Sequence, residues 1–466
     1  MTLLETLRHT VGAAHVLTEG DLSAYQVDWR KRHHGKALAV VRPGSTAEVA
    51  AVVKACAAHR VPIVAQGGNT GLVGGSVPDE SGTQILLSLG RMNRVRAIDS
   101  ANLAITVDAG CVLQAAQEAA AAHSLLLPLS LAAEGSCTLG GNLATNAGGT
   151  QVLRYGNARE LCLGLEVVTA AGEVWDGLTG LRKDNTGYDL RDLFIGSEGT
   201  LGVITGATLK LFPRPAAVTT ALATAQTVAA AIELLQLAQS MLGPALTGFE
   251  AMNEFSLALV RKQFPALRQP IAAAPWTMLV EQSDTEGASH AEALFEALLA
   301  RAFELGLITD AALATSLEQS KAMWHLRESI PLAQVQEGLN IKHDIALPIS
   351  AIPAFVADAD AALQRAFPGI RLVNFGHFGD GNLHYNVQAP EGVPPADFLG
   401  EFEKRVNRIV YDAVAAHSGS FSAEHGIGQL KRETLAERKP AVALRMMAAI
   451  KRALDPDNLL NPGRVL

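Results

Sequence analysis

The segment PIVAQGGNTGLVGGS, residues 62–76, decides the fold of the first part of the chain. It continues a strand-like run and places five glycines among small polar residues. Backbone N–H groups without side-chain cover can approach an anion closely and form a nest suited to a pyrophosphate. The segment is not a GxGxxG fingerprint, and the chain has no GxxxxGK[ST] loop. By itself, the segment fits an ordinary tight surface turn as well as a phosphate cradle.

The sequence around this segment predicts an α/β arrangement. Residues 37–65 read as strand, turn, helix and strand, with Ser45 or Thr46 as the N-cap and Glu48 in the first helical turn. Residues 85–109 predict further strands, and residues 112–123 predict an Ala-rich helix. Glycines cluster again at 135–149 and 196–206, where we expect loops or tight turns rather than the interiors of elements.

A second domain is predicted after Pro215, where the composition changes. Helical patterns near 226–242 and 286–305 accompany strand-like runs at 246–251 and 276–282. This alternation predicts an antiparallel sheet covered by helices on one face, and an α+β fold for the whole chain. We expect a first domain at 1–215, a second at 216–420, and a C-terminal segment, 421–466, that returns to the first domain.

Composition limits the classes of function. The 466 residues are 48% hydrophobic and 18% charged, with a net charge of -8, which argues against disorder and against nucleic-acid binding. Four cysteines lie scattered, without disulfide or zinc-site spacing. The first residues lack the blocks of a secretory signal, so a cytoplasmic protein is expected. A homodimer is compatible with the sequence, which does not give the oligomeric state.

The segment NFGHFGDGNLHYNV, residues 374–387, predicts a metal site. If Asp380-Gly381 forms a two-residue hairpin turn, His377 lies directly opposite His384, close enough for two imidazoles to share one ion. Asn386 points to the same face as His384. Glu424, in SAEHGIG, offers a carboxylate as third ligand, and this ligand set suits zinc or manganese. A simple contact between paired histidines, a zinc hydrolase and a metal that only fastens two segments remain alternatives.

The three glycine segments, at 62–76, 134–149 and 196–205, resemble in order and spacing the FAD-binding domain of the vanillyl-alcohol-oxidase superfamily. The resemblance implies an FAD site in the first domain. The first segment contains no histidine, so the FAD is expected to be held without a covalent link. Carried over residue by residue, the resemblance implies cofactor contacts from Gly67, Gly68, Asn69, Thr70, Gly71, Gly75, Ser76, Gly135, Ser136, Gly140, Gly141, Asn146, Gly202, Ile204 and Asn461. For Asn69, a left-handed turn residue is an equally good interpretation.

The GHFGDGNLH run and the later EHGIG resemble the D-2-hydroxy-acid dehydrogenase branch of this superfamily. The resemblance implies that His377, His384 and Glu424 bind zinc and that His425 is the general base. It further implies that Arg327 and Lys342 contact substrate carboxylates, beside Asn386.

Within this branch, the motif around Lys342 favours D-2-hydroxyglutarate as the substrate, with D-lactate or glycolate as alternatives. Pro331 departs from the branch, because these enzymes often carry a substrate-contacting threonine there. The expected reaction is proton removal from the substrate hydroxyl by His425 and hydride transfer to the flavin. The electron acceptor is expected to be an electron-transfer flavoprotein, a quinone or a cytochrome.

Overall fold

The computed structural model describes residues 1–466, which divide into two compact units. Unit 1 comprises Met1–Gly148, Gly156–Arg214 and Glu424–Leu466, whereas unit 2 comprises Gly149–Tyr155 and Pro215–Ala423. Unit 2 thus extends to 423 instead of the expected 420. It also contains the segment 149–155, which the sequence analysis assigned to the first domain. None of the helices combines the length and the apolar character needed to cross a bilayer.

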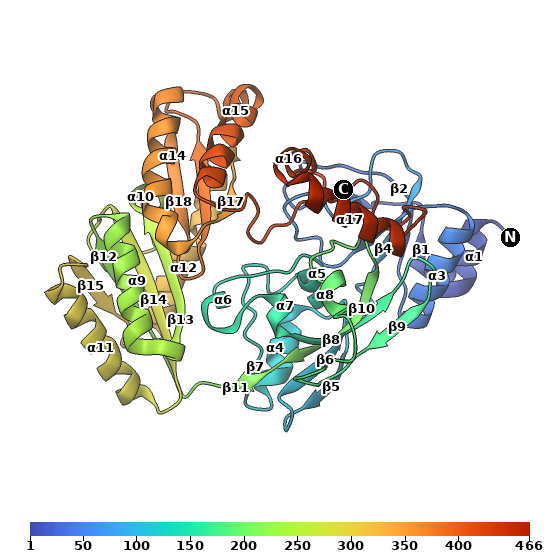
Figure 1. Ribbon diagram of the computed structural model, residues 1–466, viewed down its shortest axis with the longest axis horizontal. Coiled ribbons are helices and arrows are strands. Elements are labelled where there is room, and N and C mark those ends of the chain that lie inside the picture. Colours follow the sequence, from blue (N-terminus) through green and yellow to red (C-terminus); the bar gives the residue numbers. More distant parts are fainter. The chain divides into compact units, whose positions relative to one another are not determined.

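Unit 1 is built on two sheets and a short strand pair (Figure 1). The first sheet has the order β1-β2-β4-β3, in which β4 runs parallel to β2 and β3. The second, β5-β6-β10-β8-β9, is antiparallel throughout, and β11 pairs with β7. The strands are β1 Val16–Leu17, β2 Ala37–Val41, β3 Ile63–Gln66, β4 Gln84–Ser88, β5 Val95–Asp99, β6 Ala104–Asp108, β7 Leu125–Leu126, β8 Cys162–Val168, β9 Val174–Gly177, β10 Val203–Lys210 and β11 Phe212–Pro213.

The predicted strand, helix and strand over 37–65 are confirmed as β2, α3 and β3. Ser45 is the N-cap of α3, and its hydroxyl accepts the N–H of Glu48 at 3.2 Å. Val49, Val52 and Val53 bury one side of this helix. The helices of unit 1 are α1 Leu3–Val11, α2 Ser23–Gln26, α3 Thr46–Ala58, α4 Leu113–Ala121, α5 Leu139–Ala144, α7 Ala158–Leu161, α8 Arg191–Phe194, α16 Arg432–Arg438 and α17 Ala441–Leu454, with a 3-10 turn η1 at Ala13–His15.

Three glycines that were expected in loops lie inside elements. Gly140 and Gly141 belong to α5, and Gly206 belongs to β10. The reason is close packing: a Cβ on Gly140 would lie 2.6 Å from the Cβ of Ala109. Glycine therefore allows the short helix α5 to approach the end of β6, and its presence does not mark a turn here.

The C-terminal segment lies along the edge of the first sheet in unit 1. The N–H of Ile63 donates to Leu459 O, and the N–H of Asn461 donates to Ile63 O, both at 2.7 Å. The buried Asp455 holds this segment by accepting the N–H groups of Leu459 and Leu460. These bonds bring the end of the chain beside the strand that leads into the first glycine segment.

Unit 2 contains one antiparallel sheet of eight strands. Its order is β15-β12-β14-β13-β18-β19-β16, and β17 also pairs with β19. The strands are β12 Ala217–Ala225, β13 Leu246–Asn253, β14 Trp276–Asp284, β15 Asp310–Leu313, β16 Asn340–Ile341, β17 Asp344–Ala346, β18 Arg371–His377 and β19 Asn382–Gln388.

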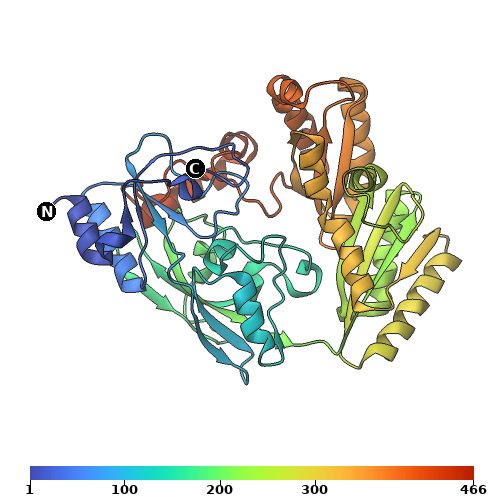
Figure 2. The same ribbon diagram turned by 180° about the vertical axis from the view of Figure 1, so that it is seen from behind.

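Helices cover both faces of this sheet, whereas one covered face was expected (Figures 1 and 2). On one face, α10, α12 and α13 pack against Leu222, Met252 and Phe375. On the other face, the side chain of Gln282 reaches α11, where it donates to Ala291 O. The helices of unit 2 are α6 Val152–Tyr155, α9 Val228–Leu242, α10 Glu254–Gln263, α11 Ala288–Glu304, α12 Leu317–Glu328, α13 Ile330–Glu337, α14 Ile352–Ala366 and α15 Pro395–Ala416, with 3-10 turns η2 Gly243–Ala245 and η3 Ile349–Ala351.

A buried charge cluster ties the second sheet of unit 1 to α3. The Asp108 carboxylate accepts Arg96 Nε at 2.6 Å and Arg94 Nε at 3.1 Å. Arg96 also donates to Glu166 at 2.8 Å, and Glu166 accepts the hydroxyl of Thr46 at 2.6 Å. Burial alone would raise the pKa of Asp108, but the hydrogen bonds from Arg96 and Arg94 lower it.

Asp108→Asn should therefore destabilise unit 1. Removing one partner of a buried pair leaves an uncompensated charge, which costs about 3 kcal/mol at neutral pH. The loss is measured as the change in urea midpoint, with the exposed Glu173→Gln as the control for one lost negative charge. Because the folded pKa of Asp108 is lowered, its contribution is present above the unfolded pKa of about 3.9 and is lost below it. A difference between the two proteins that does not shrink in acid would contradict this account.

Candidate functional site

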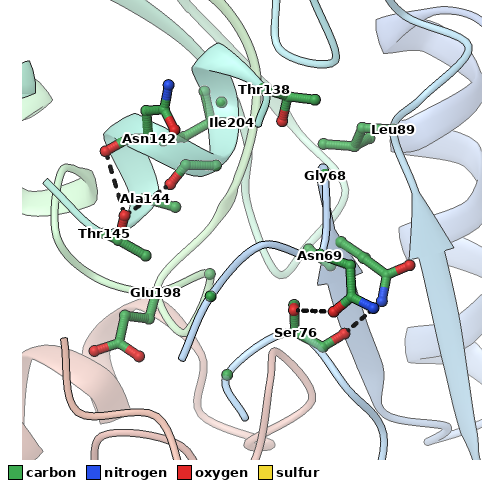
Figure 3. Close-up of a pocket in the computed structure, with 18 of the residues that line it drawn as sticks. Gly68, Asn69, Ser76, Leu89, Thr138, Asn142, Ala144, Thr145, Glu198 and Ile204 are labelled. Carbon is green, nitrogen blue, oxygen red and sulfur yellow. Dashed lines mark hydrogen bonds between the residues drawn. The ribbon is translucent and has the colours of Figure 1, made fainter. Parts of the chain in front are cut away.

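The three glycine segments meet around one pocket in unit 1, which we call the glycine pocket (Figure 3). Its walls enclose about 920 Å³ of space, including the part open to solvent. It is lined by Ala65, Gln66, Gly67, Gly68, Asn69, Thr70, Gly71, Val73, Gly75, Ser76, Leu89, Thr138, Gly140, Gly141, Asn142, Ala144, Thr145, Glu198, Gly199, Gly202, Val203, Ile204 and His425.

Close backbone approach explains why the pocket begins with glycine. A Cβ on Gly67 would lie 2.3 Å from Thr138 Oγ1, and one on Gly68 would lie 2.1 Å from Ser136 O. No side chain fits in either place, so the first and second segments can touch only through glycine. The sequence could predict glycine loops but not this mutual contact.

Most of the predicted cofactor residues line the glycine pocket, but four do not. The side chain of Asn461 donates to Gly75 O and Glu198 O, so this residue joins the first segment to the third. Asn146 accepts the N–H of Arg159 instead of facing the pocket. Gly135 and Ser136 also lie outside its lining. The pocket residues that sequence reasoning missed include Leu89, Thr138, Asn142, Thr145 and Glu198, of which all but Leu89 lie within the second and third glycine segments.

Asn69 serves the backbone turn and the pocket wall together (Figure 3). Its φ is +53°, in the left-handed region that asparagine tolerates. Its amide nitrogen donates to Ala24 O and Val27 O, and its amide oxygen accepts the hydroxyl of Ser76 at 3.0 Å. The side chain thus ties the first glycine segment to the backbone at Ala24 and Val27 and holds its last residue, Ser76.

The hairpin of unit 2 has a different register from the predicted one. His377 pairs with Asn382, and Phe375 pairs with His384, so the direct pairing of His377 with His384 is wrong. The connection is a four-residue loop, 378–381, because Phe378 is buried against Trp276 with ring centroids 5.5 Å apart. The two histidines are nevertheless diagonal neighbours on one face, and their ring centroids lie 5.4 Å apart.

A buried carboxylate that the sequence did not reveal organises this face. Glu250, on β13, accepts Arg327 Nε at 2.7 Å and bonds His377 Nδ1 at 2.5 Å. Burial would raise the pKa of Glu250, but the charges of His377 and Arg327 lower it to about 2. Arg327 is itself buried and stacks over Phe375, 4.8 Å from the ring centroid. Arg327, predicted to bind a substrate carboxylate, therefore already has a carboxylate partner.

His384 lies beside another unexpected acid, Asp344. The two residues pair across β19 and β17, with His384 Nδ1 4.0 Å from Asp344 Oδ1. The other oxygen of Asp344 accepts the N–H of Ala423 at 3.2 Å, and Glu424 and His425 follow directly in the chain. Within unit 2, His377, His384 and Asp344 thus lie together with the side-chain chemistry to hold a metal ion, whereas Glu424 and His425 begin the last stretch of unit 1.

The other two predicted substrate residues lie near each other in the sheet order, Lys342 just before β17 and Asn386 within β19. Lys342 is half-buried in the link between β16 and β17. Asn386 is buried, accepts the N–H of His343 at 3.1 Å and donates to Gln334 at 3.0 Å. Pro331, which replaced the expected threonine, lies in the first turn of α13, where a missing N–H costs nothing.

Two family models match the chain. The FAD binding domain model matches residues 37–177, and the model for the C-terminal domain of FAD linked oxidases matches residues 214–465. Solved structures show the same fold at low identity. A p-cresol methylhydroxylase matches with a TM-score of 0.75 and 16% identity over 99% of this chain and 96% of its own. A 4-ethylphenol oxidase from Gulosibacter chungangensis gives 0.72 and 19% over the same shares.

Curated relatives match over nearly the whole chain. D-2-hydroxyglutarate dehydrogenases of Danio rerio and Bos taurus, both named mitochondrial, are 40% and 39% identical over 97% and 99% of this chain and 82% and 83% of their own. The enzyme of that name from Xanthomonas citri pv. viticola is 38% identical over 99% of this chain and 96% of its own. The mitochondrial names contradict the expected cytoplasmic location. The chain is an FAD-dependent oxidoreductase that belongs to the family of FAD-linked oxidases containing these dehydrogenases.

Proposed function

We propose that the protein oxidises a D-2-hydroxy acid, D-2-hydroxyglutarate in the first place, to the 2-oxo acid. One observation carries the proposal: His425, the candidate base, lines the same pocket as the three glycine segments. The names of the relatives support the choice of substrate, and D-lactate or glycolate on the same scaffold is the alternative. Membership of the FAD-linked oxidases leaves no support for the zinc hydrolase or for a non-catalytic metal.

The glycine pocket has the chemistry that FAD requires. Gly67, Gly68 and Gly71 leave backbone N–H groups uncovered for a pyrophosphate, and the pocket contains no histidine of the first segment that could attach the flavin. FAD, when bound, supplies the acceptor for the hydride that leaves the α-carbon of the substrate. His425 holds its imidazole at the pocket wall, where it would take the proton of the substrate hydroxyl.

The histidines and acids of the second unit fit a divalent metal, zinc or manganese. Glu250 bonds Nδ1 of His377, an arrangement that directs Nε2 of a ligating histidine toward an ion. His384 and the neighbouring Asp344 of the same unit offer an imidazole and a carboxylate, and Glu424, the predicted third ligand, is the residue that follows this unit in the chain. A divalent ion held there would supply a Lewis acid for the substrate oxygens.

Charge explains the preference for a dicarboxylate. Lys342 is a half-buried, compact cation that would pair with the distal carboxylate of D-2-hydroxyglutarate. Arg327 would meet a substrate carboxylate only while sharing its charge with Glu250, so its contribution is weaker than a free guanidinium would give. Turnover requires an external acceptor for two electrons, taken together or one at a time, for which an electron-transfer flavoprotein, a quinone and a cytochrome are the candidate classes.

His425→Ala should retain yellow, FAD-bound protein but slow anaerobic flavin reduction by D-2-hydroxyglutarate by about 10²- to 10⁴-fold, the usual contribution of a general base. Stopped-flow absorbance of the flavin measures the rate. His123→Ala, an exposed histidine of the same unit, is the matched control and should behave as the wild type. Undiminished reduction by His425→Ala would remove this residue from the role of base.

His384→Ala should lose the metal without losing FAD, because His384 does not line the glycine pocket. Metal content is measured by mass spectrometry and flavin by absorbance, before and after dialysis against a chelator. Asp344→Asn tests whether this acid is also a ligand, and should lower the metal content if it is. Wild-type protein that carries no metal, and that gains no activity from added zinc or manganese, would overturn the metal site.

Lys342→Met should discriminate between the substrates. Loss of a charge-assisted contact costs about 1.5–3 kcal/mol, so KM for D-2-hydroxyglutarate should rise about 10- to 100-fold. KM for D-lactate, which has no second carboxylate, should change by less than about twofold on the same argument. Lys321→Met, which removes an exposed lysine, is the control. Equal increases for both substrates would assign Lys342 to the carboxylate that they share.

A further inference from the structure

Glu198 is a buried acid in the glycine pocket that the proposed reaction does not use. It belongs to the third glycine segment, is 8% exposed, and lines the pocket together with His425. Its φ is +54°, a left-handed conformation that few residues other than glycine and asparagine adopt. A glycine at position 198 would adopt this conformation at a lower cost in free energy. The side chain of Glu198 must therefore account for the glutamate.

Both carboxylate oxygens of Glu198 hold the segment that carries His425. Oε1 accepts the N–H of Ile427 at 2.7 Å, and Oε2 accepts the N–H of Gly428 at 2.8 Å. Figure 3 shows that the carboxylate of Glu198 points away from Asn142 and Thr145. A carboxylate that takes two successive N–H groups fixes the orientation of that peptide as well as its distance.

The backbone of Glu198 is held from two other parts of the chain. Its N–H donates to Ala144 O at 2.8 Å, and its carbonyl oxygen accepts Asn461 Nδ2 at 2.7 Å. Asn461 also donates to Gly75 O at 2.9 Å. The backbone from which the carboxylate extends is therefore anchored on both sides of the residue.

Two glycines of the segment 424–428 pass too close to their neighbours to carry a side chain. A Cβ on Gly426 would lie 2.8 Å from Glu198 Oε1, and one on Gly428 would lie 2.3 Å from Val73 O. Burial raises the pKa of Glu198, and the N–H groups of Ile427 and Gly428 and the charge of Lys431 lower it in part. The energy of keeping this acid buried is consistent with a positioning function.

We propose that Glu198 is a positioning residue for the oxidation. Its two oxygens clamp the N–H groups of Ile427 and Gly428 and so hold His425 at the wall of the glycine pocket. This inference rests on the proposed function, in which His425 is the base. The residue acts through His425 and through no contact with the substrate.

Glu198→Gln tests the clamp, because the amide keeps the shape but presents an NH2 group to one of the two N–H donors. Flavin reduction at saturating D-2-hydroxyglutarate should slow by about 10²-fold, the cost of misplacing a catalytic group by about 1 Å, with KM nearly unchanged. Amide hydrogen exchange at Ile427 and Gly428 should accelerate, in protein with and without FAD. Glu166→Gln is the matched control, since Glu166 is a hydrogen-bonded acid of the same unit outside the pocket.

A double-mutant cycle with His425→Ala separates the two proposals. If Glu198 acts through His425, Glu198→Gln should change the residual reduction rate by less than about twofold once His425 is absent. Equal slowing in both backgrounds, or unchanged hydrogen exchange at Ile427 and Gly428, would overturn the clamp. Rapid reduction by His425→Ala alone would instead overturn the base.

Glu198→Asp keeps the charge but withdraws the oxygens by one methylene, and covers the case in which Glu198→Gln does not fold. The clamp predicts slowed reduction and faster exchange in this variant also. Full activity with wild-type exchange would mean that the charge alone matters, which contradicts positioning by contact.

Discussion

The close approach of backbone to backbone is the constraint on which unit 1 depends. Three segments far apart in sequence touch around the glycine pocket, and at Gly68 a single methyl group would lie 2.1 Å from Ser136 O. The same requirement returns at Gly428, which passes against Val73 O. Sheets, helices and the returning C-terminus serve to hold these uncovered stretches together. A pocket walled by backbone offers donors that cannot rotate away, which suits a large anionic cofactor.

Unit 2 meets a different constraint, the burial of charge. Glu250 has no exposure and remains ionised only because His377 and Arg327 lie on either side of it. Removing Glu250 would take from both Arg327 and His377 the carboxylate that they share. The network therefore explains why Arg327 is rigid and why the ring of His377 has one orientation. A flexible arginine on a surface could offer neither property.

Periodicity and capping allowed the sequence to predict α3, the helices α9 and α11 of unit 2 and the antiparallel sheet, because these features depend on neighbours along the chain. The register of the hairpin failed, since it is decided by Phe378 packing against Trp276, a contact from another strand. Asp344, Glu250 and Glu198 were missed for a related reason. A lone acid carries no local pattern, and its importance arises only from partners more than thirty positions away.

Glu424, the predicted metal ligand, and His425, the candidate base, are consecutive residues. The chain bends through Ala423, Glu424 and His425, so one short segment presents both side chains. The arrangement works only if the backbone cannot rotate, because any rotation moves both side chains together. Gly426, with φ of +79°, turns the chain at once toward Ile427 and Gly428, whose N–H groups are bound by Glu198. One buried carboxylate thus fixes the orientation of both neighbouring groups.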